Sequence, residues 1–339
     1  MLVSAIFNFL TGIGILLFGV HYLGGSKEKL FGANFRKKMN KFASNRFSSF
    51  GFGALITFAL QSSTASTAIF VSFASAGIIT LFQAIGLIIG CNVGTALSSF
   101  LLAFQSINLV QIIASFVLIG VLIKTFSKKN VLASNIGNAF IGFGILFVGL
   151  VLIDFATAVF KSLEGFSSFL LNFTNPFLLI LIGTALTIIL QSSLGTFAVI
   201  ISLMASAGTS GISIISACYL VYGVNIGTCL TSILAGLSSG TDGKRVAFFH
   251  LLFNLIGTLI FTLITLFTPF ASWMQMVTSN QALQLLIVNF IFNIVTAIIT
   301  LPFVKTLKNF MRLIIRRSKK KLIVITQLEL ANYKLNYCT

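Results

Sequence analysis

Two short polar blocks interrupt apolar stretches of the chain and carry the residues best suited to chemistry. The first block is Gln61-Ser62-Ser63-Thr64, and the second is Gln191-Ser192-Ser193. Their hydroxyl and carboxamide groups offer neutral oxygens to a hard cation, and O–H or N–H donors to an anion. We therefore predict that these residues bind an anion. Hydroxyls that follow closely are candidate sodium or supporting ligands: Ser66, Thr67 and Thr196.

A purely structural role for these hydroxyls is the main alternative. Ser and Thr in apolar helices often bond back to a carbonyl of their own helix, or join two helices. For any one of these residues that role would be the more common. The return of Gln-Ser-Ser at a matching position in the second half of the chain favours a functional role.

A second pair of motifs has the pattern Gly-x-Asn-x-Gly-Thr, starting at Gly90 and again at Gly223. Two glycines around an Asn favour local unwinding, which would free carbonyl and amide oxygens for an ion. The alternative is close helix packing through small residues. The amides need a partner or a ligand in either case, because an unpaired one in hydrocarbon costs ~2–7 kcal/mol. The candidate sodium or supporting ligands are Asn92, Gly94, Thr95, Asn225, Gly227 and Thr228.

Charged side chains are absent from the segments that hold these motifs. Residues 47–123 and 165–241 contain no Asp, Glu, Lys or Arg. This argues against a carboxylate proton relay and against an Arg clamp on an anion. A helix that starts after each polar block would supply free N–H groups and about +0.5 charge. Two such helix starts balance roughly one negative charge, so divalent phosphate would need a sodium ion beside it.

No cofactor is expected beyond Na⁺ as the coupling ion. Cys91, Cys218, Cys229 and Cys338 have neither zinc-site nor redox spacing. The sequence therefore predicts no transition-metal site.

An internal repeat connects the two sets of motifs. Gln61-Ser62-Ser63 returns as Gln191-Ser192-Ser193, and the Gly-x-Asn-x-Gly-Thr motif follows each copy at nearly the same distance. Gly142 and Gly144 likewise repeat Gly12 and Gly14. Blocks that recur in one order at nearly constant spacing indicate duplication of one unit.

Composition sets the class of protein. Of the 339 residues, 57% are hydrophobic and only 8% are charged, with a mean hydropathy of +1.06. Soluble domains carry about 25% charged residues. The net charge of +17 is concentrated in loops and in the C-terminal tail, as the positive-inside rule requires, and no basic stripe indicates nucleic-acid binding. We predict an all-α, polytopic protein of the cell membrane with membrane lipid around it.

The topology follows from segment length and charge. The segments 47–76 and 174–207 are interrupted by polar residues, and each apolar arm is too short to cross ~30 Å of hydrocarbon. We read both as re-entrant hairpins, which makes the two halves inverted repeats, each with a broken helix. This topology predicts an N-terminus outside and a C-terminal tail in the cytoplasm. The expected units are repeat A at 1–130, repeat B at 131–268, an additional span at 281–304 and a basic tail at 305–339.

Paired Gln-Ser-Ser blocks, each followed by Gly-x-Asn-x-Gly-Thr, resemble the type II sodium–phosphate cotransporters in their bacterial branch. The resemblance covers about residues 1–304. It implies sodium-coupled phosphate transport, with both hairpin tips forming a shared site from the two polar blocks, and with Asn92, Thr95, Asn225 and Thr228 in support. Two features depart from the family pattern. Leu194-Gly195 replaces hydroxyls, and only the short tail 305–339 follows Val304, where many relatives carry a helical regulatory domain. The basic tail is expected on anionic lipid or as a remnant of that domain.

Other functions remain open at this stage. The alternatives are a sodium-coupled carrier of another oxyanion or a carboxylate, and a non-transporting membrane sensor or scaffold derived from a transporter. A homo-oligomer is also left open. Gly208-Thr209-Ser210-Gly211 has the form of a membrane serine-protease motif. We expect no enzyme, because Ser210 and His250 should lie on opposite sides of the membrane.

Overall fold

The computed structural model describes residues 2–28, 43, 45–106, 115–126, 130, 133–152 with gaps, 175–190, 192–205, 211–237 and 239–316. Within these ranges every regular element is helical, which confirms the predicted all-α class for this part of the chain. The labelled helices are α1 (Leu2–Glu28), α3 (Arg46–Leu60), α4 (Ser63–Ser75), α5 (Leu81–Ser99), η2 (Phe100–Ser106), α7 (Phe116–Phe126), α10 (Pro176–Leu190), α11 (Ser193–Met204), α12 (Ile214–Gly227), α13 (Cys229–Leu237), α14 (Thr241–Phe267), α15 (Phe270–Val277), α16 (Gln281–Thr300), η4 (Leu301–Phe303) and α17 (Val304–Ile314).

Several stretches are long and apolar enough to cross a membrane. Among the described residues these are Leu81–Ala103, Ile214–Leu237, Thr241–Phe267 and Gln281–Ile314. The predicted polytopic membrane class rests on these helices. The helices α3, α4, α10 and α11 are shorter, with 12 to 15 residues each.

Polar residues begin the apolar helices. Asn45 accepts a hydrogen bond from the Ser48 N–H, and the Ser48 hydroxyl lies 3.1 Å from the Asn45 N–H, so the two form a capping box at α3. Thr80 and Gln83 form the same motif at α5. These caps satisfy N–H groups that the first helical turn leaves without a partner.

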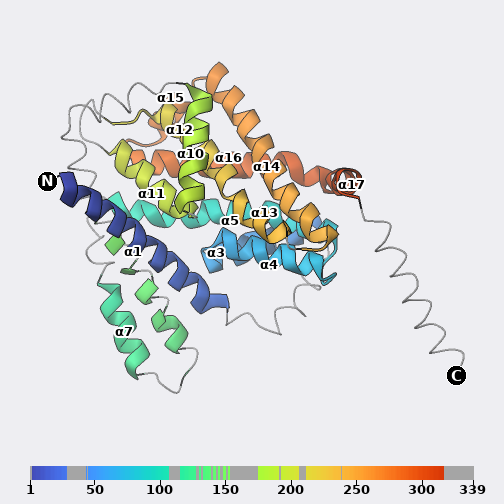
Figure 1. Ribbon diagram of the computed structural model, residues 1–339. Coiled ribbons are helices and arrows are strands. Elements are labelled where there is room, and N and C mark those ends of the chain that lie inside the picture. Colours follow the sequence, from blue (N-terminus) through green and yellow to red (C-terminus); the bar gives the residue numbers. More distant parts are fainter. Residues whose placement is uncertain are drawn as a thin grey trace, which may run out of the picture.

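Two helix pairs with equivalent sequences form the centre of the fold. α3 packs against α5 and α10 packs against α12, both through glycines (Figure 1). A Cβ at Gly90 would overlap the Phe50 carbonyl of α3, and a Cβ at Gly223 would overlap the Ile180 carbonyl of α10. Gly223 is the counterpart of Gly90 in the repeated motif. The duplication seen in the sequence is therefore also a repeat of backbone contacts.

The Gly-x-Asn-x-Gly-Thr motifs are not unwound in the way predicted. In the first half α5 is helical from Leu81 to Ser99 and continues straight through Gly90 and Asn92, so the predicted break there is wrong. The glycines serve close packing instead, and Asn92 donates from Nδ2 to the Ile88 carbonyl at 2.9 Å. In the second half the helix is interrupted only at Thr228, between α12 and α13.

α14 and α16 connect the two halves of the molecule. One apolar cluster contains residues of α11, α12 and α15, and the other contains residues of α3, α4, α5 and α17. α14 contributes Phe253 to the second cluster and Phe261 to the first, while α16 contributes Phe292 to the first and Ala297 to the second. Both helices therefore run from one cluster into the other.

Several hydrogen bonds gather distant segments at one end of the molecule. Arg46, at the start of α3, donates to the Pro302 carbonyl at 2.9 Å. The Gly240 N–H, just before α14, donates to the Ser75 hydroxyl at the end of α4 at 2.7 Å. Arg245 donates to the Ile315 carbonyl after α17. Both ends of the α3–α4 pair thus lie near the start of α14 and near α17 (Figure 1).

Candidate functional site

The first polar block forms the tip between α3 and α4. α3 ends at Leu60 and is capped by Gln61, whose φ of 53° is the only positive value at a non-glycine residue in the described part of the chain. Its N–H closes the last turn of α3 on the Thr57 carbonyl at 2.8 Å. α4 then begins at Ser63, so the chain reverses within two residues. Strain of this kind is concentrated at functional sites and costs about 1–3 kcal/mol.

The second polar block forms the equivalent tip between α10 and α11. Ser192 caps α11, accepting a hydrogen bond from the Gly195 N–H at 3.1 Å. α11 begins at Ser193, as α4 begins at Ser63. Gln191 lies outside the described residues, so its predicted role stays a prediction.

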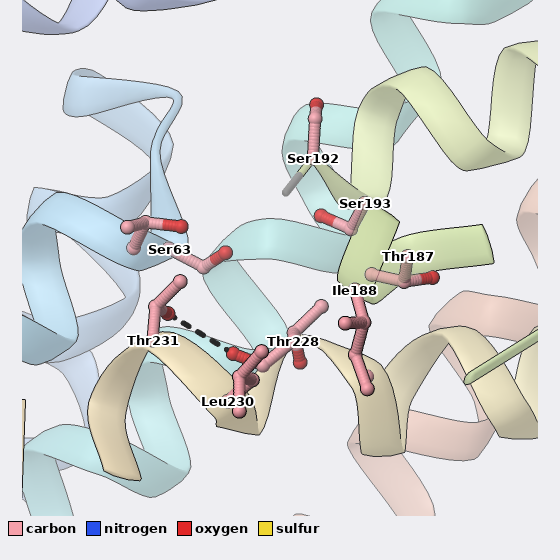
Figure 2. Close-up of a pocket in the computed structure, with 10 residues that line it drawn as sticks. Ser63, Thr187, Ile188, Ser192, Ser193, Thr228, Leu230 and Thr231 are labelled. Atoms are coloured by element: carbon pink, nitrogen blue, oxygen red, sulfur yellow. Dashed lines mark hydrogen bonds between the residues drawn. The ribbon is translucent and has the colours of Figure 1, made fainter. Parts of the chain in front are cut away.

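One pocket lies between the two tips. The space between the tips has a volume of about 260 Å³, which includes its open mouth. Figure 2 shows Ser63 and Thr231 on one side of this pocket, with Ser192 and Ser193 across it. Its lining residues are Ser63, Thr64, Thr187, Ile188, Ser192, Ser193, Gly227, Thr228, Leu230 and Thr231. The lining is rich in hydroxyl groups and contains no charged side chain.

The pocket brings together six of the residues singled out from the sequence: Ser63, Thr64, Ser192, Ser193, Gly227 and Thr228. Gln61 and Ser62 immediately precede them in the chain but do not line the pocket. Thr187, Ile188, Leu230 and Thr231 were missed. Thr187 could have been found, because it lies four residues before Gln191 as Thr57 lies before Gln61.

The remaining hydroxyls bond within their own helices. Ser66 donates to the Ser62 carbonyl at 2.9 Å, and Thr67 donates to the Ser63 carbonyl at 2.8 Å. Thr196 donates to the Ser192 carbonyl at 2.9 Å, and Thr95 to the Cys91 carbonyl at 2.8 Å. These contacts are those of the structural role. The bonds of Ser66, Thr67 and Thr196 lie in the first turns of α4 and α11, whose starts line the pocket.

Asn92 belongs to a buried polar cluster rather than to the pocket. Its Oδ1 accepts from Nδ2 of Asn254 on α14 at 3.2 Å, and it lies 3.4 Å from Nε2 of His250. His250 Nδ1 in turn lies 2.8 Å from the Ser232 hydroxyl. All four side chains are buried.

Asn225 has the equivalent set of partners on α16. Its Oδ1 accepts from Asn293 Nδ2 at 3.2 Å, and its Nδ2 donates to Asn289 Oδ1 at 3.1 Å. Asn289 also donates to the Ser99 hydroxyl at 3.5 Å. Asn254 and Asn293 were not predicted as partners, although the pair Phe253-Asn254 recurs later in the chain as Phe292-Asn293. The predicted need of Asn92 and Asn225 for partners is thus met within the protein.

Asn254→Ala is expected to destabilise the fold by about 1–3 kcal/mol, because Asn92 Oδ1 would lose its amide donor in a buried site. The variant should unfold at a lower temperature in detergent than the parent protein. Asn309→Ala, at an exposed position of α17, is the matched control and should leave the midpoint unchanged. An unaltered midpoint for Asn254→Ala would show that the cluster adds nothing to stability.

His250, which was set against Ser210 in the sequence, is buried inside the protein. It is 2% exposed, well inside α14, among the contacts just described. Ser210 of the protease-like motif lies outside the described residues. Ser232 is therefore the hydroxyl that the structure pairs with this imidazole, and it also donates to the Cys229 carbonyl at 2.8 Å.

The class of protein emerges from comparison with known sequences. Residues 15–154 match the family model described as Na⁺/Pi-cotransporter. A candidate inorganic phosphate export protein of Escherichia coli O157:H7, YjbB, is 30% identical over 311 residues, covering 91% of this chain and 55% of the relative. The chain thus spans about half the length of that protein.

Two further relatives match different shares of the chain. YqeW of Bacillus subtilis strain 168, an uncharacterized protein, is 28% identical and is covered over 96% of its length, against 92% of this chain. The human sodium-dependent phosphate transport protein 2C is 39% identical over 100 residues, which are 28% of this chain and 16% of the human protein. No solved structure matches the chain. These matches confirm the resemblance to the type II sodium–phosphate cotransporters.

Proposed function

We propose that this protein carries inorganic phosphate across the cell membrane together with sodium, and that phosphate binds in the pocket between the two tips. The observation that carries the proposal is the meeting of two helix starts at one pocket. α4 and α11 both begin there, at Ser63 and Ser193. Their N–H groups and the pocket hydroxyls are the donors that an oxyanion needs in a site without cationic side chains.

Sodium follows from the charge of the substrate. Two helix starts supply about +0.5 each, which leaves a divalent phosphate short of roughly one positive charge. Carbonyl and hydroxyl oxygens around the tips are hard ligands that suit Na⁺. Gln61, Ser62 and Gln191 remain candidate phosphate ligands, and Asn92 and Asn225 remain candidate sodium or supporting residues. The proposed mechanism therefore needs no cofactor besides Na⁺ as the coupling ion, and it includes no catalytic step.

An inverted pair of re-entrant hairpins is the architecture we propose around this site. Both ends of the α3–α4 pair lie at the molecular end that also holds Lys244, Arg245 and α17. The α10–α11 pair belongs to the other apolar cluster, which also contains Ile212 and residues of α15. The positive-inside rule supports a cytoplasmic position for the basic end. Opposite entry of the two pairs is typical of transporters with a site at the midplane.

The remaining parts of the proposal concern the whole chain. Repeat A would comprise residues 1–130 and repeat B residues 131–268, with a further span at 281–304. The N-terminus would lie outside and the tail in the cytoplasm. YjbB is named for phosphate export, which supports phosphate as the substrate. The direction of net flux would depend on the gradients of sodium and phosphate.

Uptake by purified protein in proteoliposomes tests the function. We expect accumulation of labelled phosphate when an inward sodium gradient is imposed, and at least about tenfold less when potassium replaces sodium, because the anion would lack its countercharge. Excess unlabelled sulfate or a dicarboxylate should not compete.

Two outcomes would contradict the proposal. Phosphate uptake of equal rate without sodium would remove the coupling. Stronger competition by sulfate or a carboxylate than by phosphate would make the protein a carrier of that other anion.

A further inference from the structure

We propose that α17 is an in-plane interfacial helix that binds anionic lipid headgroups at the basic end of the molecule. The inference rests on the proposed membrane orientation but not on phosphate transport. It starts from the residue pattern of Val304–Ile314, whose side chains fall on three distinct faces of one helix.

The first face holds α17 on the protein. Val304 and Met311 are fully buried in the cluster around α5, and Leu307 packs against the same cluster. These residues recur at intervals of three and four, so they share one side of the helix. α17 contacts α5 and α14.

The other two faces are opposite in character, and their residues are exposed except for Lys308, which is half-buried. Phe310, Leu313 and Ile314 are 44%, 62% and 46% exposed, an apolar surface that water would not favour. Lys305, Lys308 and Arg312 recur at intervals of three and four on the other side of the core face. The structure gives none of these three cations an ion pair within the residues it describes.

This arrangement fits the boundary between the acyl chains and the headgroups of a bilayer better than it fits water or a protein interior. An interfacial helix buries its apolar side among acyl chains and holds its basic side at the headgroups. α17 is the last part of the apolar stretch Gln281–Ile314, so its exposed apolar side chains directly follow a helix that is long enough to cross a membrane. A basic stripe at the end of a span favours anionic over zwitterionic lipid.

Both ends of α17 are fastened to the protein, so its height in the membrane is preset. Arg46 donates to the Pro302 carbonyl before the helix. Arg245, 5% exposed, donates from Nε and Nη2 to the Ile315 carbonyl at 2.9 and 2.7 Å, and pairs with Asp242 at 2.6 Å. A cation at the last carbonyls of a helix also stabilises it, because that end of the helix carries a partial negative charge. The lipid site is therefore preformed.

A single fluorescent reporter can test the proposal in the intact chain. The only tryptophan is Trp273 on α15, so Trp273→Phe with Phe310→Trp places one reporter on the apolar face of α17. In proteoliposomes, acyl chains brominated near the headgroup should quench this reporter. Brominated phosphatidylglycerol should quench several times more than brominated phosphatidylcholine at equal mole fraction in a phosphatidylcholine background.

Removal of the cations should abolish the lipid preference. Each cation contributes about fivefold near an anionic surface, so Lys305→Gln, Lys308→Gln and Arg312→Gln together should bring the ratio of the two quenching efficiencies close to one. Lys124→Gln, an exposed cation in the last turn of α7, is the matched control and should keep the full ratio. An unchanged unfolding midpoint of the triple variant verifies its fold.

Three results of the quenching comparison would overturn the proposal. They are no quenching by either lipid, an equal effect of both lipids on the parent reporter, and a ratio that the triple variant retains. Release of quenching by added inorganic phosphate would also overturn it, by making the site one for free anions. Because the assay measures no transport, it stays valid if uptake fails.

Discussion

A Ser63→Ala, Ser193→Ala double variant is expected to lose at least about 100-fold in apparent phosphate affinity. Both hydroxyls line the pocket from the first residue of a helix, where a bound oxyanion would accept from them. A hydrogen bond to a charged group contributes about 1.5–3 kcal/mol, which is roughly ten- to a hundredfold for each hydroxyl. Sodium-driven uptake measured over a range of phosphate concentrations provides the test.

The choice of serines separates binding from folding. Ser192 caps α11 through the Gly195 N–H, so its replacement would also weaken the helix. Neither the Ser63 nor the Ser193 hydroxyl makes such a hydrogen bond within its helix among the described residues. Ser72→Ala, at an exposed position further along α4, should transport as the parent does. A double variant with parental affinity would eliminate the pocket as the phosphate site.

Gly90→Ala and Gly223→Ala should each destabilise the protein by about 3 kcal/mol or more. The added methyl group would overlap the carbonyl of Phe50 or of Ile180, and backbone atoms of a packed helix cannot move aside as a side-chain end can. Overpacking of a filled interior typically costs about 1–3 kcal/mol, and here the whole α3–α5 or α10–α12 contact would have to open. The unfolding midpoint in detergent measures the loss.

Gly51→Ala is the matched control, because a Cβ there meets no other atom within 4 Å. Gly51 lies on α3, next to Phe50, which contacts Gly90. The substitution also removes a glycine from a helix, where glycine costs about 0.5–1 kcal/mol relative to alanine. The control should therefore be as stable as the parent or slightly more so. Equal midpoints for Gly51→Ala and Gly90→Ala would disprove the role of close backbone contact.

Particular residues show where sequence reasoning was sufficient. The nearly constant spacing of the repeat predicted that Ser63 and Ser193 occupy equivalent places, and both begin a helix at the same pocket. Gly90 shows where it was not. A glycine in an apolar segment is compatible with unwinding and with close packing, and the pattern Gly-x-Asn-x-Gly-Thr does not distinguish them. The choice depended on α3, whose Phe50 carbonyl lies where a side chain would be.

The polar cluster around Asn92 and Asn225 marks the same limit. Their need for partners followed from the cost of an unpaired amide in hydrocarbon. The identity of those partners, Asn254 on α14 and Asn293 on α16, depended on how helices far along the chain cross the two halves.

The amino-acid sequence by itself determined the membrane class, the duplication and the polar blocks at the tips, because hydropathy, spacing and residue type are local properties of the chain. Only the tertiary structure decided which polar groups share a pocket and at which glycines two helices touch. It also decided that hydrogen bonds hold both ends of α17 at one end of the molecule. These features depend on distances between segments that are far apart in sequence, and such distances are set by packing of the whole molecule.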